Sequence, residues 1–230
     1  MRKRTLKTAF LATIPVMTGY LVMGMALGIL MADKGYGWWW SALMGITIYA
    51  GSMEFVAVNL LSGGATIIST AIMTLLVQAR HLFYGVSLLE KYRGIGKAKP
   101  YLIFGLTDET YALACNGAPE GLDKRRYYFY ITLFDHLYWI TGSIIGGILG
   151  AAINFDTRGL DFAMTALFIV IFTDQALSMR DHVPAVIGVV SALVCLLIFG
   201  TENFLIPSML LITALLLALG ALRKRKEAAR

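Results

Sequence analysis

Long apolar runs, interrupted by short polar breaks such as Asp33-Lys34 and Ser62-Gly63-Gly64, fill nearly the whole chain. About 20 apolar residues in a helix span the hydrocarbon core of a bilayer. We therefore predict an all-α integral membrane protein, a polytopic bundle of seven to eight transmembrane helices in a single transmembrane domain over residues 1–230. The expected spans are residues 9–31, 41–61, 65–89, 100–118, 127–152, 161–177, 183–199 and 204–222.

The first apolar run follows a basic start, as in a secretory signal peptide. It continues to Ala32, however, and has no clear cleavage site between small residues. The apolar core of a signal peptide is only about 7–15 residues long. We expect this first helix to be retained.

The second run carries Gly51, Ser52 and Glu54 near its middle. A Gly-Ser pair beside a carboxyl group at bilayer depth suits a broken helix with exposed backbone groups. A continuous helix, with Gly51 at a packing contact and Glu54 bonded to a neighbour, fits the same residues. Both interpretations stay open at this point.

The third run ends with Arg80, His81 and Tyr84. Arg80 and Tyr84 are four residues apart and share a helix face, whereas His81 points to a neighbouring side. An arginine at the centre of a membrane helix costs about 2.5–3.5 kcal/mol on insertion scales. This cost favours an Arg80 that faces the interior of the bundle rather than lipid.

The run at 100–118 is short and has Thr107, Asp108 and Glu109 at its centre. Adjacent carboxylates so placed would be poorly tolerated against lipid, so other helices shield the segment or it is re-entrant. Asp135-His136 and Asp174 add ionisable groups to later spans.

Two pairs of segments suggest a weak internal repeat over about residues 9–89 and 127–199. TGYLVMGMALG from Thr18 resembles TGSIIGGILG from Thr141, and SALMGITIYAGSMEF from Ser41 resembles TALFIVIFTDQALSM from Thr165. The offsets are 123 and 124 residues. Chance similarity of Gly-rich helices is the alternative, but the shared spacing favours a repeat, as in many transporters.

Composition and charge support a membrane protein. Hydrophobic residues make up 58% of the chain and charged residues 15%, against about 45–50% and 25% in soluble domains. The net charge of +6 does not indicate nucleic acid, because 16 of the 20 basic residues lie in clusters flanking the apolar spans, which is the positive-inside pattern.

Eight crossings from a cytoplasmic N-terminus would put one cluster, at 91–99, on the wrong side; a re-entrant segment or seven crossings would remove the conflict. The clusters occupy residues 1–7, 91–99, 124–126 and 223–230.

Three functions fit the buried ionisable residues: a transporter, an intramembrane enzyme and a non-catalytic membrane subunit. The enzyme is disfavoured because no His-Glu-x-x-His, cysteine cluster or serine nucleophile motif is present; we expect no metal and no cofactor. A transporter of a small zwitterion would use Arg80 for the carboxylate and the acids for the ammonium group or a coupling proton. The candidate substrate-binding or proton-coupling residues are Gly51, Ser52, Glu54, Arg80, His81, Tyr84, Thr107, Asp108 and Glu109, with Asp135, His136 and Asp174 as further candidates.

Four stretches of the chain carry a family resemblance: YAGSMEFVAVNLL from Tyr49, VQARHLFYG from Val77, LTDETYAL from Leu106 and WITGSIIGGILG from Trp139. They resemble the AzlC family, the large subunit of bacterial branched-chain amino acid exporters. The resemblance runs from about Thr13 to Ile153 and more loosely to the end. Its most specific parts are the Arg-His-x-x-Tyr-Gly and Thr-Asp-Glu motifs.

The resemblance implies export of leucine, isoleucine, valine and analogues such as azaleucine across the bacterial cytoplasmic membrane by a multi-pass protein. It also implies a small AzlD-type membrane subunit as partner, besides the lipid bilayer. Family members commonly have Gln or Glu at the position of Glu54; only a carboxyl group can take up a proton there. No Walker-type nucleotide motif is present, so the proton gradient is the expected energy source.

Overall fold

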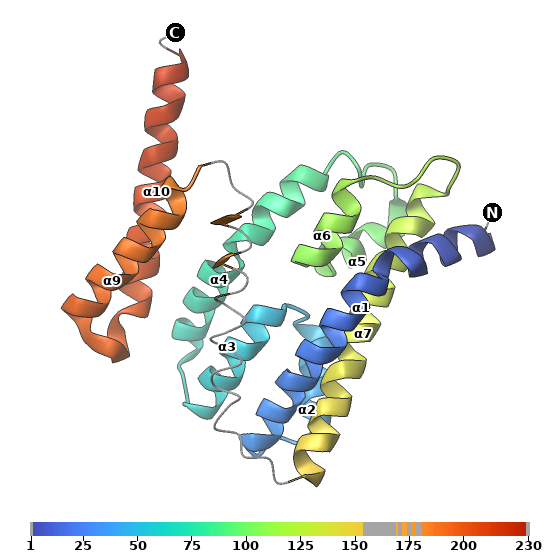
Figure 1. Ribbon diagram of the computed structural model, residues 1–230, viewed down its shortest axis with the longest axis horizontal. Helices are drawn as coiled ribbons and strands as arrows, with labels where there is room; N and C mark the ends of the chain where they lie inside the picture. Colours follow the sequence, from blue (N-terminus) through green and yellow to red (C-terminus); the bar gives the residue numbers. More distant parts are fainter. Residues whose placement is uncertain (1, 154–168, 170–171, 174–175, 178–180, 229–230) are drawn as a thin grey trace. The chain divides into compact units, whose positions relative to one another are not determined.

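The computed structural model describes residues 2–153, 169, 172–173, 176–177 and 181–228, and every regular element in them is a helix. The chain divides into two compact units, Met1–Met164 and Thr165–Arg230. The first unit contains the helices from α1 to α7, and the second contains α9 and α10 (Figure 1).

Three long helices form the frame of the first unit. They extend about 48, 33 and 44 Å at 1.5 Å per residue, more than the roughly 30 Å of a hydrocarbon core. Between them lie short helices of 3 to 12 residues. The long helices are α1 (Arg2–Asp33), α4 (Ile67–Leu88) and α7 (Lys124–Ala152); the short ones are α2 (Trp38–Thr47), α3 (Gly51–Ser62), η1 (Gly96–Ala98), α5 (Lys99–Phe104) and α6 (Asp108–Cys115).

Glycines allow α1 and α7 to pack in close contact. The Phe10 and Phe134 rings lie 5.6 Å apart near one end, and a methyl group on Gly24 would lie 2.9 Å from the Trp139 carbonyl oxygen. Further along, Gly28 lies against the backbone of Ser143. Residue numbers rise together along both helices, so they run parallel. The Gly-rich stretches proposed as a repeat therefore pack on each other, while the repeat itself stays a prediction.

The second expected span is a broken helix. α2 begins beside Gly147 and follows α7 to the level of Trp139, where Gly51 lies. The chain turns between the two short helices, and Tyr49 there adopts a φ of +44°, a conformation uncommon outside glycine. Of the two interpretations left open by the sequence, the broken helix is confirmed.

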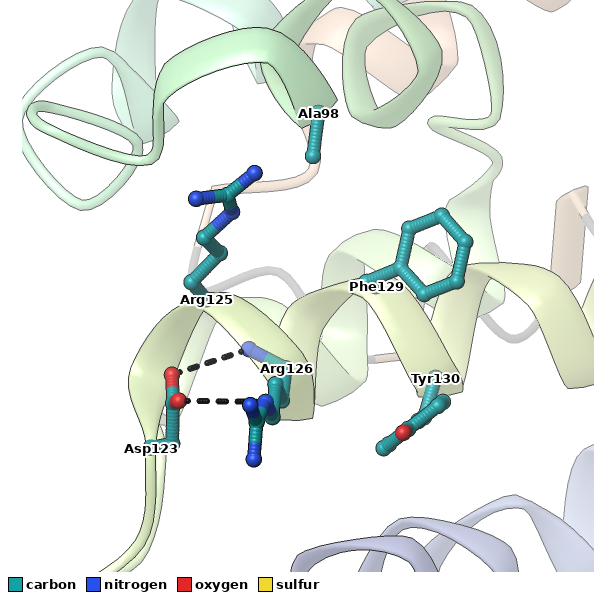
Figure 2. Close-up of a pocket in the computed structure, with 6 residues that line it drawn as sticks. All are labelled: Ala98, Asp123, Arg125, Arg126, Phe129 and Tyr130. Atoms are coloured by element: carbon teal, nitrogen blue, oxygen red, sulfur yellow. Dashed lines mark hydrogen bonds and ion pairs between the residues drawn. The ribbon is translucent and has the colours of Figure 1, made fainter. Parts of the chain in front are cut away.

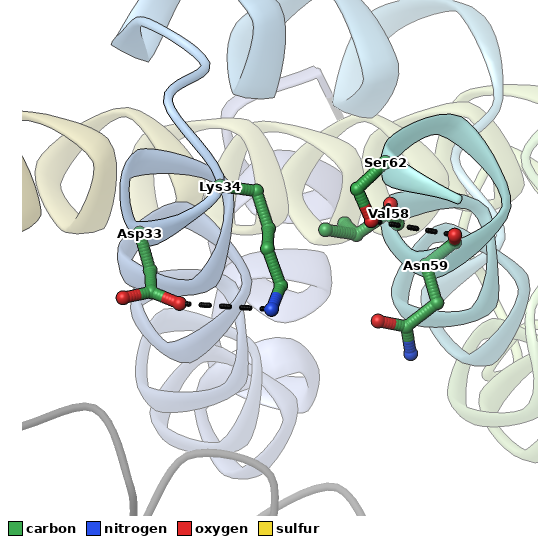
Figure 3. A network of polar contacts seen from close by, with 5 residues as sticks. All are labelled: Asp33, Lys34, Val58, Asn59 and Ser62. Atoms are coloured by element: carbon green, nitrogen blue, oxygen red, sulfur yellow. Dashed lines mark hydrogen bonds and ion pairs between the residues drawn. The ribbon is translucent and has the colours of Figure 1, made fainter. Parts of the chain in front are cut away.

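After the break, α3 returns toward the end of the unit from which α2 came. Its last residue, Ser62, lies on the same side of the unit as Asp33 and Lys34 at the end of α1 (Figures 1 and 3). α2 and α3 are about 15 and 18 Å long, too short to cross a bilayer singly. Together they form a hairpin that starts and finishes at the same end of the first unit, the end at which α1 also finishes.

A second hairpin enters the first unit from the opposite end. α5 starts close to Arg125 at the beginning of α7 and reaches the level of Thr132 at Gly105, where the helix stops. α6 then returns to Cys115, whose carbonyl accepts a hydrogen bond from Lys91 in the loop before η1. The segment 100–118 therefore contains two short helices that form a hairpin within the unit, and its course relative to a membrane stays a prediction.

The N-terminal cluster, the loop at 91–99 and the start of α7 at 124–126 lie at the same end of the unit (Figure 1). The expected count of seven to eight crossings is not confirmed, because 41–61 and 100–118 are pairs of short helices. Most of the expected span at 161–177 lies outside the described residues.

The basic end also contains a pocket of about 560 Å³ beside the first turns of α7 (Figure 2). Asp123 caps that helix: its Oδ1 accepts from the Arg126 backbone N–H at 3.1 Å. Its Oδ2 lies 3.4 Å from Nε of the Arg126 side chain. One carboxylate thus satisfies a free backbone donor and orients a guanidinium.

Replacing Asp123 with alanine should lower the free energy of unfolding by about 1 kcal/mol, because the α7 cap is lost. Asp123→Asn should keep most of that stability, since asparagine also caps helices and the exposed ion pair contributes little. Thermal unfolding of the purified protein in detergent measures both variants, with Glu120→Ala in the same loop as control. Equal loss in Asp123→Asn would show that the ion pair, not the cap, matters.

The described residues of the second unit include two largely apolar helices, α9 (Val183–Asn203) and α10 (Leu205–Ala228). In the described chain, two helices are both long and apolar enough to cross a membrane by themselves: Lys3–Asp33 and Val183–Gly200. Ile67–Ala79 and Leu210–Leu222 are shorter apolar segments.

Candidate functional site

The site is built on one turn near the middle of α7. Asp135, His136 and Trp139 are buried there, with exposed fractions of 0%, 8% and 2%. They lie at the level where the two hairpins stop and turn back. Each of the three side chains contacts a different short helix or its flanking turn.

Trp139 reaches the first turn of α3. Its indole Nε1 donates to both carboxylate oxygens of Glu54, at 3.1 and 3.2 Å. The backbone N–H of Ala50 donates to the same carboxylate at 2.9 Å. Gly51 in this turn packs on the indole, since a methyl group there would lie 3.4 Å from the ring, in ordinary van der Waals contact. Glu54, fully buried, is thus held by neutral donors, and it completes the N-terminus of α3.

His136 reaches the last turn of α2 and the helix α5. Its Nε2 lies 2.9 Å from the Gly45 carbonyl oxygen, which can only accept, so Nε2 carries a hydrogen. Nδ1 lies 3.0 Å from the Tyr101 hydroxyl. The Gly45 carbonyl is available because the helix breaks: the Tyr49 N–H that would bond to it goes instead to Met44. The Tyr49 and His136 rings are 4.2 Å apart at a tilt of 35°.

Asp135 ends a chain of hydrogen bonds that starts at Glu109. The Tyr20 hydroxyl of α1 lies 2.6 Å from Glu109 Oε2 and 2.6 Å from Thr107 Oγ1. The Thr107 Oγ1 atom lies 3.0 Å from Thr110 Oγ1, and Thr110 Oγ1 lies 2.9 Å from Asp135 Oδ2. Three hydroxyl groups therefore connect two carboxyl groups across α1, α6 and α7.

Thr107 owes its position to the N-terminus of α6. It is the N-cap residue, and its Oγ1 accepts from the Thr110 backbone N–H at 3.2 Å. The N-cap places Asp108 and Glu109 in the first helical turn, where carboxylates complement the helix dipole. Gly105 lies two residues before Thr107. A side chain would not fit at this position, because the Thr132 methyl group occupies the space.

Two predicted site residues on α4, His81 and Tyr84, lie beside an apolar cleft and the Tyr111 ring. The His81 and Tyr84 rings are 5.5 Å apart, and Tyr84 stacks on Tyr111 of α6 at 4.4 Å. His81 also lines an apolar cleft of about 290 Å³ between α4 and α5. The lining includes Val86, Leu89, Ile103 and Leu106, with Lys99 and Tyr92 as polar members. Burial raises the pKa of Tyr92, which keeps its phenol neutral.

Several of the predicted residues meet around α7. Glu54, Thr107, Glu109, Asp135 and His136 all take part in the contacts above, whereas His81 and Tyr84 lie at the cleft and beside Tyr111. Ser52 is buried in the first turn of α3, and Asp108 begins α6. The side chain of Arg80 and the whole of Asp174 lie outside what the structure describes.

Sequence reasoning missed four residues of the site: Tyr20, Tyr101, Thr110 and Trp139. Each of them carries a hydroxyl group or an indole within an expected span, at residues 9–31, 100–118 or 127–152. Within the described residues, no group of three or more His, Cys, Asp or Glu side chains is placed to hold a metal ion.

Comparisons with known proteins agree with the motifs. A family model described as AzlC protein matches residues 15–153. The chain is 46% identical to the branched-chain amino acid transport protein AzlC of Bacillus subtilis, over 97% of this chain and 87% of that protein. It is 42% identical to membrane proteins of Helicobacter pylori, over 97% of both chains, and of Haemophilus influenzae, over 89% of this chain and 84% of that one. No solved structure matches the chain.

Proposed function

The chain belongs to the AzlC family of membrane proteins, and we propose that it exports branched-chain amino acids across the cytoplasmic membrane by using the proton gradient. The observation that carries this proposal is the meeting of two broken helices around α7, in a chain 46% identical to a branched-chain amino acid transport protein. Secondary transporters commonly bind substrate and coupling ion between discontinuous helices near the bilayer midplane.

The interior of the first unit suits the coupling ion. Glu54, Glu109 and Asp135 are carboxyl groups held by hydroxyl, indole and backbone donors. Intramembrane acids of this kind mark ion pathways and proton relays in many transporters. They support proton coupling rather than ATP hydrolysis, for which the sequence has no motif.

The apolar cleft suits the side chain of the substrate. Its volume of about 290 Å³ and aliphatic lining fit a leucine, isoleucine or valine side chain. One methylene in an apolar pocket changes affinity by only about 1–3 kcal/mol, so these amino acids and methionine should compete for transport. Arg80, on the same helix as the cleft residue His81, is the proposed partner of the substrate carboxylate.

The two hairpins also support an orientation in the membrane. Basic residues accumulate in cytoplasmic loops, and three basic clusters lie at one end of the first unit (Figure 1). We therefore place the N-terminus, the loop at 91–99 and the start of α7 in the cytoplasm. The partner in transport is a small AzlD-type membrane subunit, a proposal that rests on the family resemblance.

Counterflow of labelled leucine in liposomes tests this function. Purified protein, with and without a co-expressed small subunit, should exchange internal unlabelled leucine for external label, and an imposed pH gradient should drive accumulation. Collapse of the gradient should abolish accumulation and leave counterflow intact. No leucine, isoleucine or valine flux with either preparation would reject the proposal; chemically altered leucine would indicate an enzyme instead.

A further inference from the structure

The hydrogen-bond chain from Glu109 to Asp135 contains more contacts than its hydroxyl hydrogens can make. Four oxygen–oxygen contacts of 2.6, 2.6, 3.0 and 2.9 Å join the two carboxyl groups through Tyr20, Thr107 and Thr110. All four are within the range of O–H···O bonds. Three hydroxyl groups supply only three hydrogens, because a hydroxyl donates once.

With both carboxyl groups ionised, one contact would lack a hydrogen. Tyr20 would donate to Glu109, Thr107 to Thr110 and Thr110 to Asp135. The Tyr20–Thr107 contact at 2.6 Å would then bring two lone pairs together. The Thr110 N–H, which donates to Thr107 at 3.2 Å, does not supply the missing hydrogen. The chain is complete only with a fourth hydrogen on one of its two ends.

We propose that Glu109 and Asp135 share one bound proton, which moves between them through the hydroxyl groups of Tyr20, Thr107 and Thr110. With the proton on Glu109, every hydroxyl donates toward Asp135; with it on Asp135, every hydroxyl donates toward Glu109. Transfer breaks one O–H bond and forms another at each oxygen, so atoms and charge balance. This proposal rests on the proposed proton-coupled transport.

The two ends of the chain differ in their surroundings. Glu109 is half-buried in the first turn of α6, whereas Asp135 is fully buried and its second oxygen, Oδ1, makes no hydrogen bond within the described residues. Glu109 is therefore the end at which the proton exchanges, and Asp135 is the end that stores it. Other titratable groups near the chain are His136 and Tyr127 on α7, Tyr49 at the first break and Tyr101 on α5.

Isosteric removal of single hydroxyl groups tests the chain. Tyr20→Phe keeps the ring that packs edge-on against Trp139, and Thr110→Val keeps the shape of the buried side chain. Each should lower pH-driven leucine accumulation by at least about tenfold, since one proton-transfer group typically contributes 10²-fold or more. Each should retain at least half of wild-type counterflow at equal pH, which requires no net proton transfer.

Two control variants match these changes. Thr132→Val removes a fully buried hydroxyl that makes no hydrogen bond within the described residues, and Tyr138→Phe removes one that contacts only Thr13 among them. Both should keep accumulation and counterflow. Wild-type accumulation in Tyr20→Phe and Thr110→Val would overturn the proposal, and so would parallel loss of both activities, which would indicate a structural role.

Infrared spectroscopy tests the bound proton without transport. The wild-type protein in lipid should show the carboxylic acid C=O band of a proton held on Glu109 or Asp135. The double variant Glu109→Gln, Asp135→Asn should lose it, and Thr110→Val should shift it. An unchanged band in the double variant would overturn the proposal. If the double variant loses the band but the wild-type protein shows no pH-driven transport, proton coupling is refuted, whereas the proton shared by Glu109 and Asp135 is still supported.

Discussion

Gly28→Ala should abolish the packing of α1 on α7 and leave little folded protein. The added methyl group would overlap the backbone of Ser143 and Gly147. Overpacking costs about 1–3 kcal/mol where side chains can shift; here the obstacles are backbone atoms, and the helices must separate. We expect a loss of at least about 3 kcal/mol, because small residues are what allow membrane helices such close contact.

Gly19→Ala in the same helix is the matched control. Apart from its chain neighbours and the backbone of its own helix, a methyl group at Gly19 would have no described atom within 4 Å, and alanine is favoured over glycine in a helix by about 1 kcal/mol. This variant should be as stable as the wild type or more so. Fluorescence-detected size-exclusion after heating in detergent compares the two. Equal stability of Gly28→Ala and Gly19→Ala would contradict the close helix contact.

Glu54→Gln should reduce leucine export at least about tenfold while the protein still reaches the membrane, as expected for loss of a proton-transfer group. The amide oxygen of glutamine can keep the bonds from the Ala50 N–H and the Trp139 indole, so the fold survives. Its NH₂ group cannot take up a proton. Transport in vesicles, normalised to the amount of inserted protein, measures the effect.

Further variants separate the role of Glu54 in the fold from its role in transport. Glu54→Ala leaves two buried donors without an acceptor, at a cost of about 1–3 kcal/mol for each, and should lower stability as well as transport. Glu90→Gln changes an exposed carboxylate in a loop and should alter neither. Wild-type export by Glu54→Gln would remove this carboxyl group from the mechanism.

Arg80→Ala should likewise reduce export without preventing membrane insertion, because we assign Arg80 to the substrate carboxylate. The reduction should appear in counterflow as well as in pH-driven transport, since substrate binding precedes both. Counterflow of labelled leucine in liposomes, with Glu90→Gln as the same control, measures it. An unchanged rate of counterflow would show that the substrate carboxylate is bound elsewhere.

Much of the fold followed from local patterns. Apolar runs predicted α1, α4, α7, α9 and α10 to within a few residues at most ends, because a helix in lipid must satisfy its backbone hydrogen bonds internally whatever surrounds it. The Gly-Ser and Thr-Asp-Glu segments marked both breaks, since such polar groups are too costly against lipid. The crossings could not be counted from the same patterns, because a broken hairpin and a continuous span have similar composition.

The candidate site was predictable only in part. Glu54 and Glu109 stood out because a carboxyl group in an apolar run is expensive. Tyr20 and Trp139 did not stand out, because aromatic side chains are common in membrane helices. The hydroxyl or indole N–H of such a side chain becomes part of a site only when packing places a hydrogen-bond partner beside it. Thr110 was likewise ordinary until α6 placed its hydroxyl beside Asp135.

The sequence by itself determined that this chain is helical, lies in a membrane and belongs to the AzlC family, because hydrophobicity, charge clusters and motifs are local properties of the chain. Only the tertiary structure decided which polar groups act together. Residues 20, 107, 110 and 135 come from three helices, and their hydrogen bonds exist because α1 and α7 approach at glycines and α6 turns back beside them. Hydrogen bonds act over about 3 Å, so such a network depends on distances that only packing sets.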